Sequence, residues 1–279
     1  MGNRVSFLEE FWGKKCTFSR SFLSEDRESF PSLVSGIKAD ILDLGGKKMA
    51  VSQEDISFLK EVLPFWSSLE KRAQEQLAGA VTRRSYRKGE LLHQGHECLG
   101  VMVLRSGQVR TFLVSDSGKE VTLYRSFERD VCLFSASCVL HNITFEVNIE
   151  AEEDTVVLLI PAALWKELSK TSLAVSDYAG QLMASQFSEV MWTVEQILFM
   201  SFDRRLALFL LEQSSIEGSD TLNITQETIA KHMGSAREVV TRMLRYFQGE
   251  GLVRLFRGGI ELLDREKLER LTESSKSTK

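Results

Sequence analysis

The chain has 279 residues, 43% of them hydrophobic and 27% charged, which is ordinary for a soluble globular protein and long enough for two domains. Its 39 acidic and 35 basic side chains give a net charge of −4, so any affinity for a polyanion must come from a local patch. The apolar runs are too short for a membrane span and no secretory signal opens the sequence. We therefore expect a cytoplasmic protein with no membrane partner.

The first 48 residues differ from the rest of the chain. They have a mixed composition without a sustained period, and they end in Gly45-Gly46-Lys47-Lys48 directly before Met49. Purine-rich codons for this run can spell a ribosome-binding sequence ahead of an ATG. We predict that residues 1–48 are a disordered or mistakenly assigned extension and that Met49 is the true start. A short regulatory arm is the alternative.

The middle of the chain changes from a helical to a strand pattern. Residues 51–77 have helical spacing with a break near Pro64. From about residue 80 to 159, short apolar runs alternate with turn signals such as Ser106-Gly107, which is typical of a compact antiparallel barrel or jelly roll. The clearest predicted strands are 101–104, 109–114, 121–124, 145–151 and 156–160.

Two helices are predicted next. Pro161 opens a short one, and a longer one extends from about residue 173 to 199. On the long helix five apolar residues recur at spacings of four and three, which is typical of a seam against a parallel partner helix. They are Met183, Phe187, Val190, Val194 and Ile197. We predict a dimer interface there, with an intramolecular core stripe as the alternative, and a hinge at residues 200–202.

Residues 222–263 have the pattern of a helix-turn-helix followed by a β-ribbon. Thr225 is placed to cap a first helix, Gly234 to end it in the left-handed conformation, and Ser235 to cap a second helix over residues 236–248. Two β-rich pieces then flank Arg257-Gly258-Gly259, a hairpin signal that predicts a wing. Paired short helices with a tight turn are typical of DNA-reading units.

The outer face of the second helix is polar and suited to base edges. An arginine fork matches the two acceptors of guanine, a glutamate accepts from the cytosine amino group, and a hydroxyl holds a phosphate. The segment from residue 231 to 257 contains six basic and two acidic residues and is therefore locally basic. DNA affinity from such a patch would depend strongly on salt concentration. The predicted DNA-binding residues are Thr225, Gln226, Ser235, Arg237, Glu238, Thr241, Arg242 and Arg245. An amphipathic helix pair with merely solvated arginines is the alternative.

This order of elements resembles the family of the cAMP receptor protein and the fumarate and nitrate reduction regulator. The motifs that carry the resemblance are residues 86–90, 104–109, 149–155 and 234–242. It implies an α+β chain with a cyclic-nucleotide-binding-like β-roll (jelly roll) as a sensor domain at residues 50–170. It also implies a dimerisation helix and hinge at 171–200 and a winged helix-turn-helix at 201–272.

The resemblance also implies partners and base-reading roles. Arg237, Glu238 and Arg242 occupy the positions of the family's base-reading trio, which implies a half-site of the TGTGA type. A homodimer would place two such helices about one duplex turn apart on a two-fold symmetric operator in double-stranded DNA. RNA polymerase is a further expected partner.

The predicted ligand pocket departs from the family pattern. Members that bind a cyclic nucleotide carry an arginine for the phosphate, and Phe145 stands about where it should be. A buried phosphate without its charge partner would be costly, so we do not expect control by cAMP. The predicted pocket residues Cys132, Phe134, Cys138 and Phe145 suit a small hydrophobic or aromatic effector, or they fill the barrel without a ligand.

Two other functions are considered. A thiol-based redox sensor acting through Cys132 and Cys138 is the alternative to a small-molecule effector, although free cysteines are usually buried packing residues. None of the four cysteines forms a CxxC pair, which argues against a disulfide framework or a zinc site. A cupin-like enzyme would need histidine ligands on its strands, and the predicted strands contain none. We predict a transcription regulator that is not an enzyme and has no cofactor.

Overall fold

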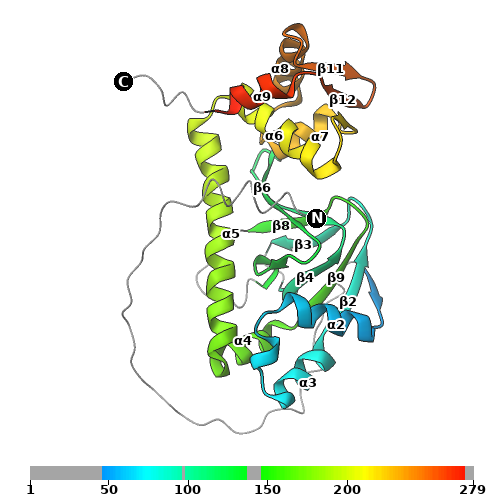
Figure 1. The fold of residues 1–279 in the computed structure, drawn as a ribbon, viewed down its shortest axis with the longest axis vertical. Helices are drawn as coiled ribbons and strands as arrows, with labels where there is room; N and C mark the ends of the chain where they lie inside the picture. The colour runs from blue at the N-terminus through cyan, green and yellow to red at the C-terminus, as the bar shows by residue number, and fades with distance from the viewer. Residues whose placement is uncertain (1–45, 96–97, 137–145, 274–279) are drawn as a thin grey trace. The chain divides into compact units, whose positions relative to one another are not determined.

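The computed structural model describes residues 46–95, 98–136 and 146–273. Two antiparallel sheets form a β-roll in its first half (Figure 1). One sheet has the strand order β1 (Lys47–Met49), β2 (Thr82–Tyr86), β9 (Thr155–Ile160), β4 (Val101–Ser106) and β7 (Val131–Cys132). The other has the order β3 (Leu91–Gly95), β8 (Val147–Ala151), β5 (Gln108–Val114) and β6 (Glu120–Phe127).

Several helices accompany the β-roll. They are α2 (Gln53–Val62), η1 (Trp66–Ser68), α3 (Lys71–Ala80), η2 (Phe134–Ala136), α4 (Ala162–Thr171) and α5 (Leu173–Phe199). A capping box starts α2: Ser52 Oγ accepts from the Asp55 backbone N–H at 3.1 Å, and the Asp55 carboxylate accepts from the Ser52 N–H at 2.9 Å. The predicted helical region 51–77 thus breaks near Pro64 into α2, η1 and α3.

The alternation of side chains along the strands builds two cores. In β4, Met102 and Leu104 lie in a cluster that joins side chains of both sheets, whereas Val101 and Val103 lie in a cluster with residues of α2, α3 and α4. Because successive residues of a strand point to opposite faces, one apolar run serves both clusters. This explains why residues 101–104 of β4 and 156–160 of β9 are continuous apolar runs rather than alternating with polar residues.

The predicted strands are confirmed as β4, β5, β6, β8 and β9, each within a few residues of the expected bounds. Phe145, at the start of the fourth predicted strand, lies outside the described residues. Gly107 in the β4–β5 turn has φ +89, and an added Cβ atom would lie 2.5 Å from Thr155 Oγ1. This turn therefore requires glycine.

The long helix α5 has the predicted bounds and extends along the β-roll (Figure 1). Gln186 donates from Nε2 to the Val131 carbonyl at 2.8 Å, and Thr193 donates from its hydroxyl to the Leu123 carbonyl at 2.7 Å. None of the helices in the described residues combines the length and the hydropathy that a membrane span requires.

The last part of the chain, residues 202–272, is called the reader below. It contains α6 (Phe202–Glu217), β10 (Thr221–Leu222), α7 (Gln226–His232), α8 (Arg237–Gly249), β11 (Val253–Phe256), β12 (Gly259–Leu262) and α9 (Arg265–Thr272). Its three strands pair in the order β10-β12-β11, and one apolar cluster joins α6 to α9. The β-roll, long helix and winged helix-turn-helix of the predicted α+β fold are all present.

Candidate nucleic-acid interface

Helix α7 begins and ends as predicted. Thr225 is its N-cap, and Thr225 Oγ1 accepts a hydrogen bond from the Thr228 backbone N–H at 3.1 Å. Gly234 follows the helix with φ +61, the left-handed conformation that ends many helices. The turn between α7 and α8 is therefore short, as in helix-turn-helix units.

Ser235 does not cap the second helix, contrary to the prediction. The N-cap of α8 is Ala236, with φ −81 and ψ 144 and no side-chain hydrogen bond. Ser235 instead completes the turn, where its backbone N–H donates to the Ala230 carbonyl at 3.0 Å. The N-cap of α8 is thus Ala236, one position after the predicted Ser235.

Helix α8 separates an anchored face from an open one. Val240, Leu244 and Phe247 are fully buried in the core of the reader. On the other face four of the predicted DNA-binding side chains are exposed to solvent. They are Arg237, Glu238, Arg242 and Arg245. A helix held this way can present its charged face to a groove without losing its own packing.

Thr241 and Gln226 contact each other across the two helices. Thr241 Oγ1 lies 2.5 Å from Gln226 Oε1 and 2.8 Å from the Arg237 carbonyl. Both residues were predicted to bind DNA, and the contact brings the start of α7 to the exposed face of α8. This contact links the start of α7 to the first turns of α8.

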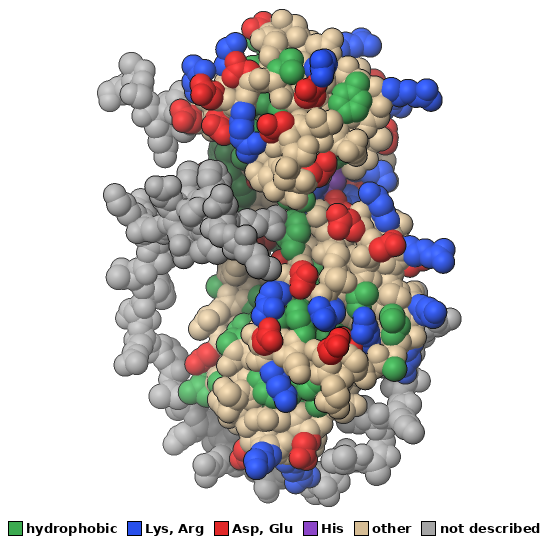
Figure 2. Space-filling view, turned by 45° about the vertical axis from the view of Figure 1, so that its right-hand side comes forward, with side chains coloured by type: hydrophobic (Ala, Val, Ile, Leu, Met, Phe, Trp, Pro, Cys, Tyr) green, Lys and Arg blue, Asp and Glu red, His purple; other side chains and the backbone are tan. Residues whose placement is uncertain are grey.

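The predicted basic patch is partly neutralised within the chain. Lys231 Nζ lies 3.4 Å from Glu120 Oε1, and Arg254 forms an ion pair with Glu261. For the other four basic residues, the described part of the chain provides no ion-pair partner. They are Arg237, Arg242, Arg245 and Arg257. Elsewhere acidic and basic side chains are interspersed, as Figure 2 shows for one face.

The interior of the β-roll holds two of the predicted pocket residues. Cys132 is fully buried, with its Sγ atom 3.5 Å from the Tyr124 hydroxyl, and the ring of Phe134 lies 6.1 Å from the Tyr124 ring. Burial raises the pKa of the Cys132 thiol, which keeps it protonated and weakly nucleophilic. Cys132 is a free thiol, whereas Cys98 is disulfide-bonded. Cys138 and Phe145 lie outside the described residues.

The predicted seam on α5 is divided between two environments. Met183 and Val190 pack partly against the β-roll, as the intramolecular alternative expected. Phe187 and Ile197 are 61% and 43% exposed. Further large apolar side chains of α5 are also exposed. They are Leu173, Met191, Leu198 and Phe199. Because single chains rarely leave so many large apolar side chains in water, the exposed part of α5 is a candidate interface.

Both halves of the chain match known family models. Residues 83–172 match the cyclic nucleotide-binding domain, and residues 204–271 match the Crp-like helix-turn-helix domain. Over 210 residues the chain is 30% identical to the transcriptional activator protein FnrA of Stutzerimonas stutzeri, which covers 71% of this chain and 83% of that protein. It is 28% identical to the transcriptional activator protein anr of Pseudomonas aeruginosa over 76% of this chain and 88% of that protein.

A solved structure shares the fold and nearly half of the aligned residues. The crystal structure of a transcriptional regulator of the Crp/Fnr family from Eubacterium rectale is 49% identical, with a TM-score of 0.75. The match covers 77% of this chain and 100% of that one. These relatives are regulators of transcription rather than enzymes. The chain belongs to the Crp/Fnr family of DNA-binding transcription regulators.

Proposed function

We propose that the protein controls transcription as a homodimer that reads a two-fold symmetric operator in double-stranded DNA. The observation that carries the proposal is the exposure of Arg237, Glu238 and Arg242 on one face of a helix whose other face is buried. Two guanidinium forks can bind guanine, and a carboxylate can accept from cytosine, which supports a half-site of the TGTGA type. The remaining predicted contacts would hold phosphates and set the register. They are Thr225, Gln226, Ser235, Thr241 and Arg245.

Replacing Arg242 by alanine tests this assignment. Loss of a bidentate guanine contact is expected to weaken operator binding by about 1 to 3 kcal/mol and to relax selectivity at one base pair. Fluorescence anisotropy at one fixed salt concentration, with an operator duplex and a scrambled duplex, measures both effects. Arg87→Ala, at an exposed arginine of the β-roll, is the control and should bind like the wild type.

Equal losses on the operator and the scrambled duplex would contradict a base-reading role for Arg242. They would instead indicate a phosphate contact, because such contacts contribute to all sequences alike.

The proposed dimer would use the exposed side of α5. Two parallel copies of this helix would cover Phe187 and Ile197, and they would relate the two readers by a two-fold axis. Val194, which is partly buried, would lie in the same seam. We assign residues 171–200 to dimerisation and hinge, residues 50–170 to the sensor domain and residues 201–272 to DNA binding.

Phe187→Asp is expected to convert the dimer to a monomer, because it would place a carboxylate in an apolar seam. Sedimentation velocity over a range of protein concentrations measures the change. Ser185→Asp adds the same charge at an exposed position about half a turn away on α5, so it should remain dimeric. A dimer that survives Phe187→Asp as well as Ser185→Asp would refute the proposed interface.

We propose that the effector is not a cyclic nucleotide. The buried side chains of Cys132 and Phe134 support an apolar interior, and in the sequence Phe145 stands about where phosphate-binding relatives carry arginine. With Cys138, these residues suit a small hydrophobic or aromatic effector or a filled β-roll. RNA polymerase is the partner expected of a regulator of this type.

Redox sensing through Cys132 and Cys138 is the second candidate. Its support is the sequence position of the two thiols near the predicted pocket. The burial of Cys132 and its raised pKa do not favour it, because thiol oxidation requires an accessible thiolate. We therefore place it after the small-molecule effector.

A further inference from the structure

The end of α7 and the turn after it rest against the hairpin formed by β5 and β6. Val121 and Met233 form an isolated antiparallel bridge. A Cβ atom added to Gly234 would lie 3.2 Å from the Val121 Cβ and 3.6 Å from the Glu120 carbonyl oxygen. Lys231 forms its ion pair with Glu120 at the same place. The absence of a side chain at Gly234 thus leaves room for the turn to approach the hairpin closely.

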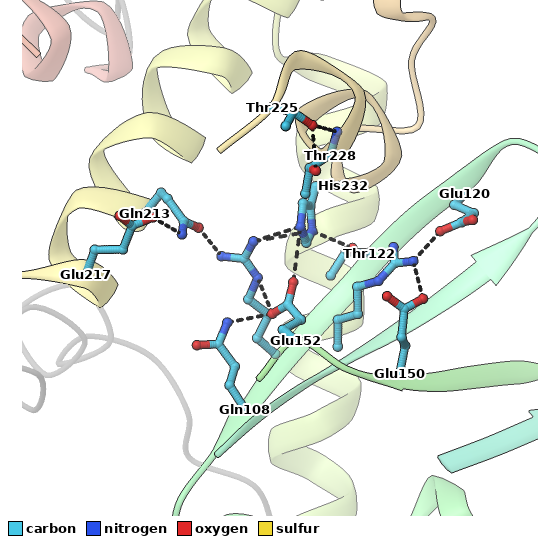
Figure 3. Close-up of polar contacts among 12 residues, drawn as sticks. Gln108, Glu120, Thr122, Glu150, Glu152, Gln213, Glu217, Thr225, Thr228 and His232 are labelled. Atoms are coloured by element: carbon cyan, nitrogen blue, oxygen red, sulfur yellow. Dashed lines mark hydrogen bonds and ion pairs between the residues drawn. The ribbon is translucent and has the colours of Figure 1, made fainter. Parts of the chain in front are cut away.

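His232 lies at the centre of this contact (Figure 3). It is 8% exposed, with Nδ1 2.8 Å from Thr122 Oγ1 and Nε2 3.1 Å from Glu152 Oε1. Since the carboxylate can only accept, we assign the ring proton to Nε2. Nδ1 then accepts from the Thr122 hydroxyl. Both ring nitrogens of a reader residue are therefore bound by side chains of the β-roll.

Arg125 extends the contact from β6 to a second helix of the reader. Its guanidinium pairs with Glu152 at 3.1 Å and donates from Nη1 to Gln213 Oε1 of α6 at 2.9 Å. The same group lies 5.4 Å from the centre of the Phe209 ring. Gln108 of β5 donates to Glu152 from the other side. Arg125 thus joins β6 directly to α6, and it is connected to His232 of α7 through Glu152, which pairs with both side chains.

Strand β6 also contacts the interior of the β-roll and the long helix. The β5–β6 pairing shifts register so that Thr122 and Tyr124 pair with adjacent residues of β5 and Leu123 is bulged out between them. The Leu123 carbonyl accepts from Thr193 of α5, and the Tyr124 hydroxyl lies beside Cys132. One strand therefore contacts the predicted pocket, the predicted dimer helix and the reader within four residues.

We propose that these residues form a docking contact that holds the reader in one orientation and transmits the state of the β-roll interior to it through β6. The docking contact is defined as Glu120, Val121, Thr122, Arg125 and Glu152 of the β-roll with Gln213, Lys231, His232 and Met233 of the reader. The inference rests on the proposed function and describes how DNA binding would be regulated.

The docked arrangement favours DNA reading rather than blocking it. Arg237, Glu238 and Arg242 are exposed while the end of α7 is covered, so the docking contact does not cover the reading face. A dimer must place two reading helices about one duplex turn apart. If each reader is already held in place, less conformational freedom is lost when both bind.

A network of this kind is suited to switching between two states. A buried polar network stabilises one geometry when all of its hydrogen bonds are formed. When only some of them are formed, the buried groups left without partners make the network unfavourable. A small displacement of β6 by an effector would therefore release the reader rather than shift it gradually.

Hydrogen exchange in the full-length dimer, without DNA, tests whether the docking contact exists in solution. Arg125→Met retains the length of the side chain but removes its charge and donors. Exchange is expected to become faster in β6 and at the end of α7. Arg129→Met is the matched control, because Arg129 is half exposed and pairs with Glu61 at the surface rather than with the reader. It should exchange like the wild type.

Operator affinity of the same proteins tests whether the docking contact matters for reading. Arg125→Met is expected to weaken operator binding by about 5- to 150-fold, the usual range for coupling between sites. His232→Gln changes the reader side of the docking contact. It should also make exchange faster and operator binding weaker. It keeps the test decisive if Arg125→Met fails to fold, and circular dichroism establishes folding in each case.

Three results would overturn the inference. Unchanged exchange in both folded variants would show that the contact does not hold the reader. Faster exchange with unchanged affinity would show that it does not transmit to DNA binding, and tighter binding would show that docking opposes reading. If the wild type itself does not discriminate operator from scrambled DNA, the proposed function fails. The exchange experiment uses no DNA, so it still shows whether the docking contact forms in solution.

Discussion

Replacing Phe247 by alanine is expected to lower the free energy of unfolding of the reader by about 3 to 5 kcal/mol, the range measured for large-to-small changes at buried aromatic residues. Phe247 is fully buried in α8, in the cluster that joins α6 to the wing. The lost side chain would leave a cavity in a core that also anchors Val240 and Leu244. Operator binding should fall with the folded fraction, since the reading face depends on this anchorage.

The adjacent residue provides the control. Tyr246 is 57% exposed, so Tyr246→Ala should change the free energy of unfolding by about 0.5 kcal/mol or less. Urea denaturation followed by circular dichroism measures both variants. Equal destabilisation by the two substitutions would show that α8 is not oriented as described, because two neighbouring residues of a helix cannot both face its core.

Acidification from pH 7 towards pH 4 is expected to release the reader from the β-roll. Burial lowers the pKa of His232 to about 4, opposed by the hydrogen bond to Glu152 and assisted by the nearby charges of Arg125 and Arg110. An undocked His232 would return to the ordinary value of about 6.5. The undocked state therefore binds the proton more readily.

The sign and size of the pH effect follow from this difference. The contribution of neutral His232 to docking is fully present above about pH 6.5 and is lost as the pH falls towards 4. At about 1.4 kcal/mol for each pKa unit, the total is about 3 kcal/mol. Glu152 does not offset this loss. Although burial raises its pKa, the bonds to His232 and Arg125 lower it to about 2, so Glu152 remains ionised across the window.

An NMR titration of the His232 ring measures the pKa directly, and His232→Gln identifies its signal. A parallel series of thermal unfolding curves should show reader stability falling between pH 6.5 and 4 in the wild type but much less in His232→Gln. Titration of His232 near its ordinary value of about 6.5 would contradict the buried environment on which this prediction depends.

Local pattern was sufficient for most elements of this chain. The bounds of α5 could be predicted because 27 residues of helical spacing lie between Ser172, which precedes the helix, and Phe199 at its end. The wing could be predicted because Gly258 lies between two β-rich segments and glycine readily adopts the positive φ that a tight hairpin needs. In the structure Gly258 has this positive φ. The assigned cap at Ser235 was wrong because serine is equally suited to a turn, and only the backbone decides which position is extended.

Some elements could not be predicted from local pattern. Strand β2 has the sequence Thr-Arg-Arg-Ser-Tyr, which is too polar for a typical strand, yet it pairs with both β1 and β9. The two residues of β10 are a strand only because they complete the sheet of the wing. Pairing with distant neighbours supplies hydrogen bonds that these short segments could not obtain alone.

By itself, the sequence determined the order of elements, the polar face of α8 and the family to which the chain belongs, because these depend on spacing within a few turns of helix or strand. Only the tertiary structure decided that Arg125, Glu152 and His232 meet, although up to 107 residues separate them in the sequence. Charged residues far apart in a sequence resemble ordinary solvated surface residues. They become a specific site only where folding excludes water from between them. Their charged groups must then form hydrogen bonds and ion pairs with one another.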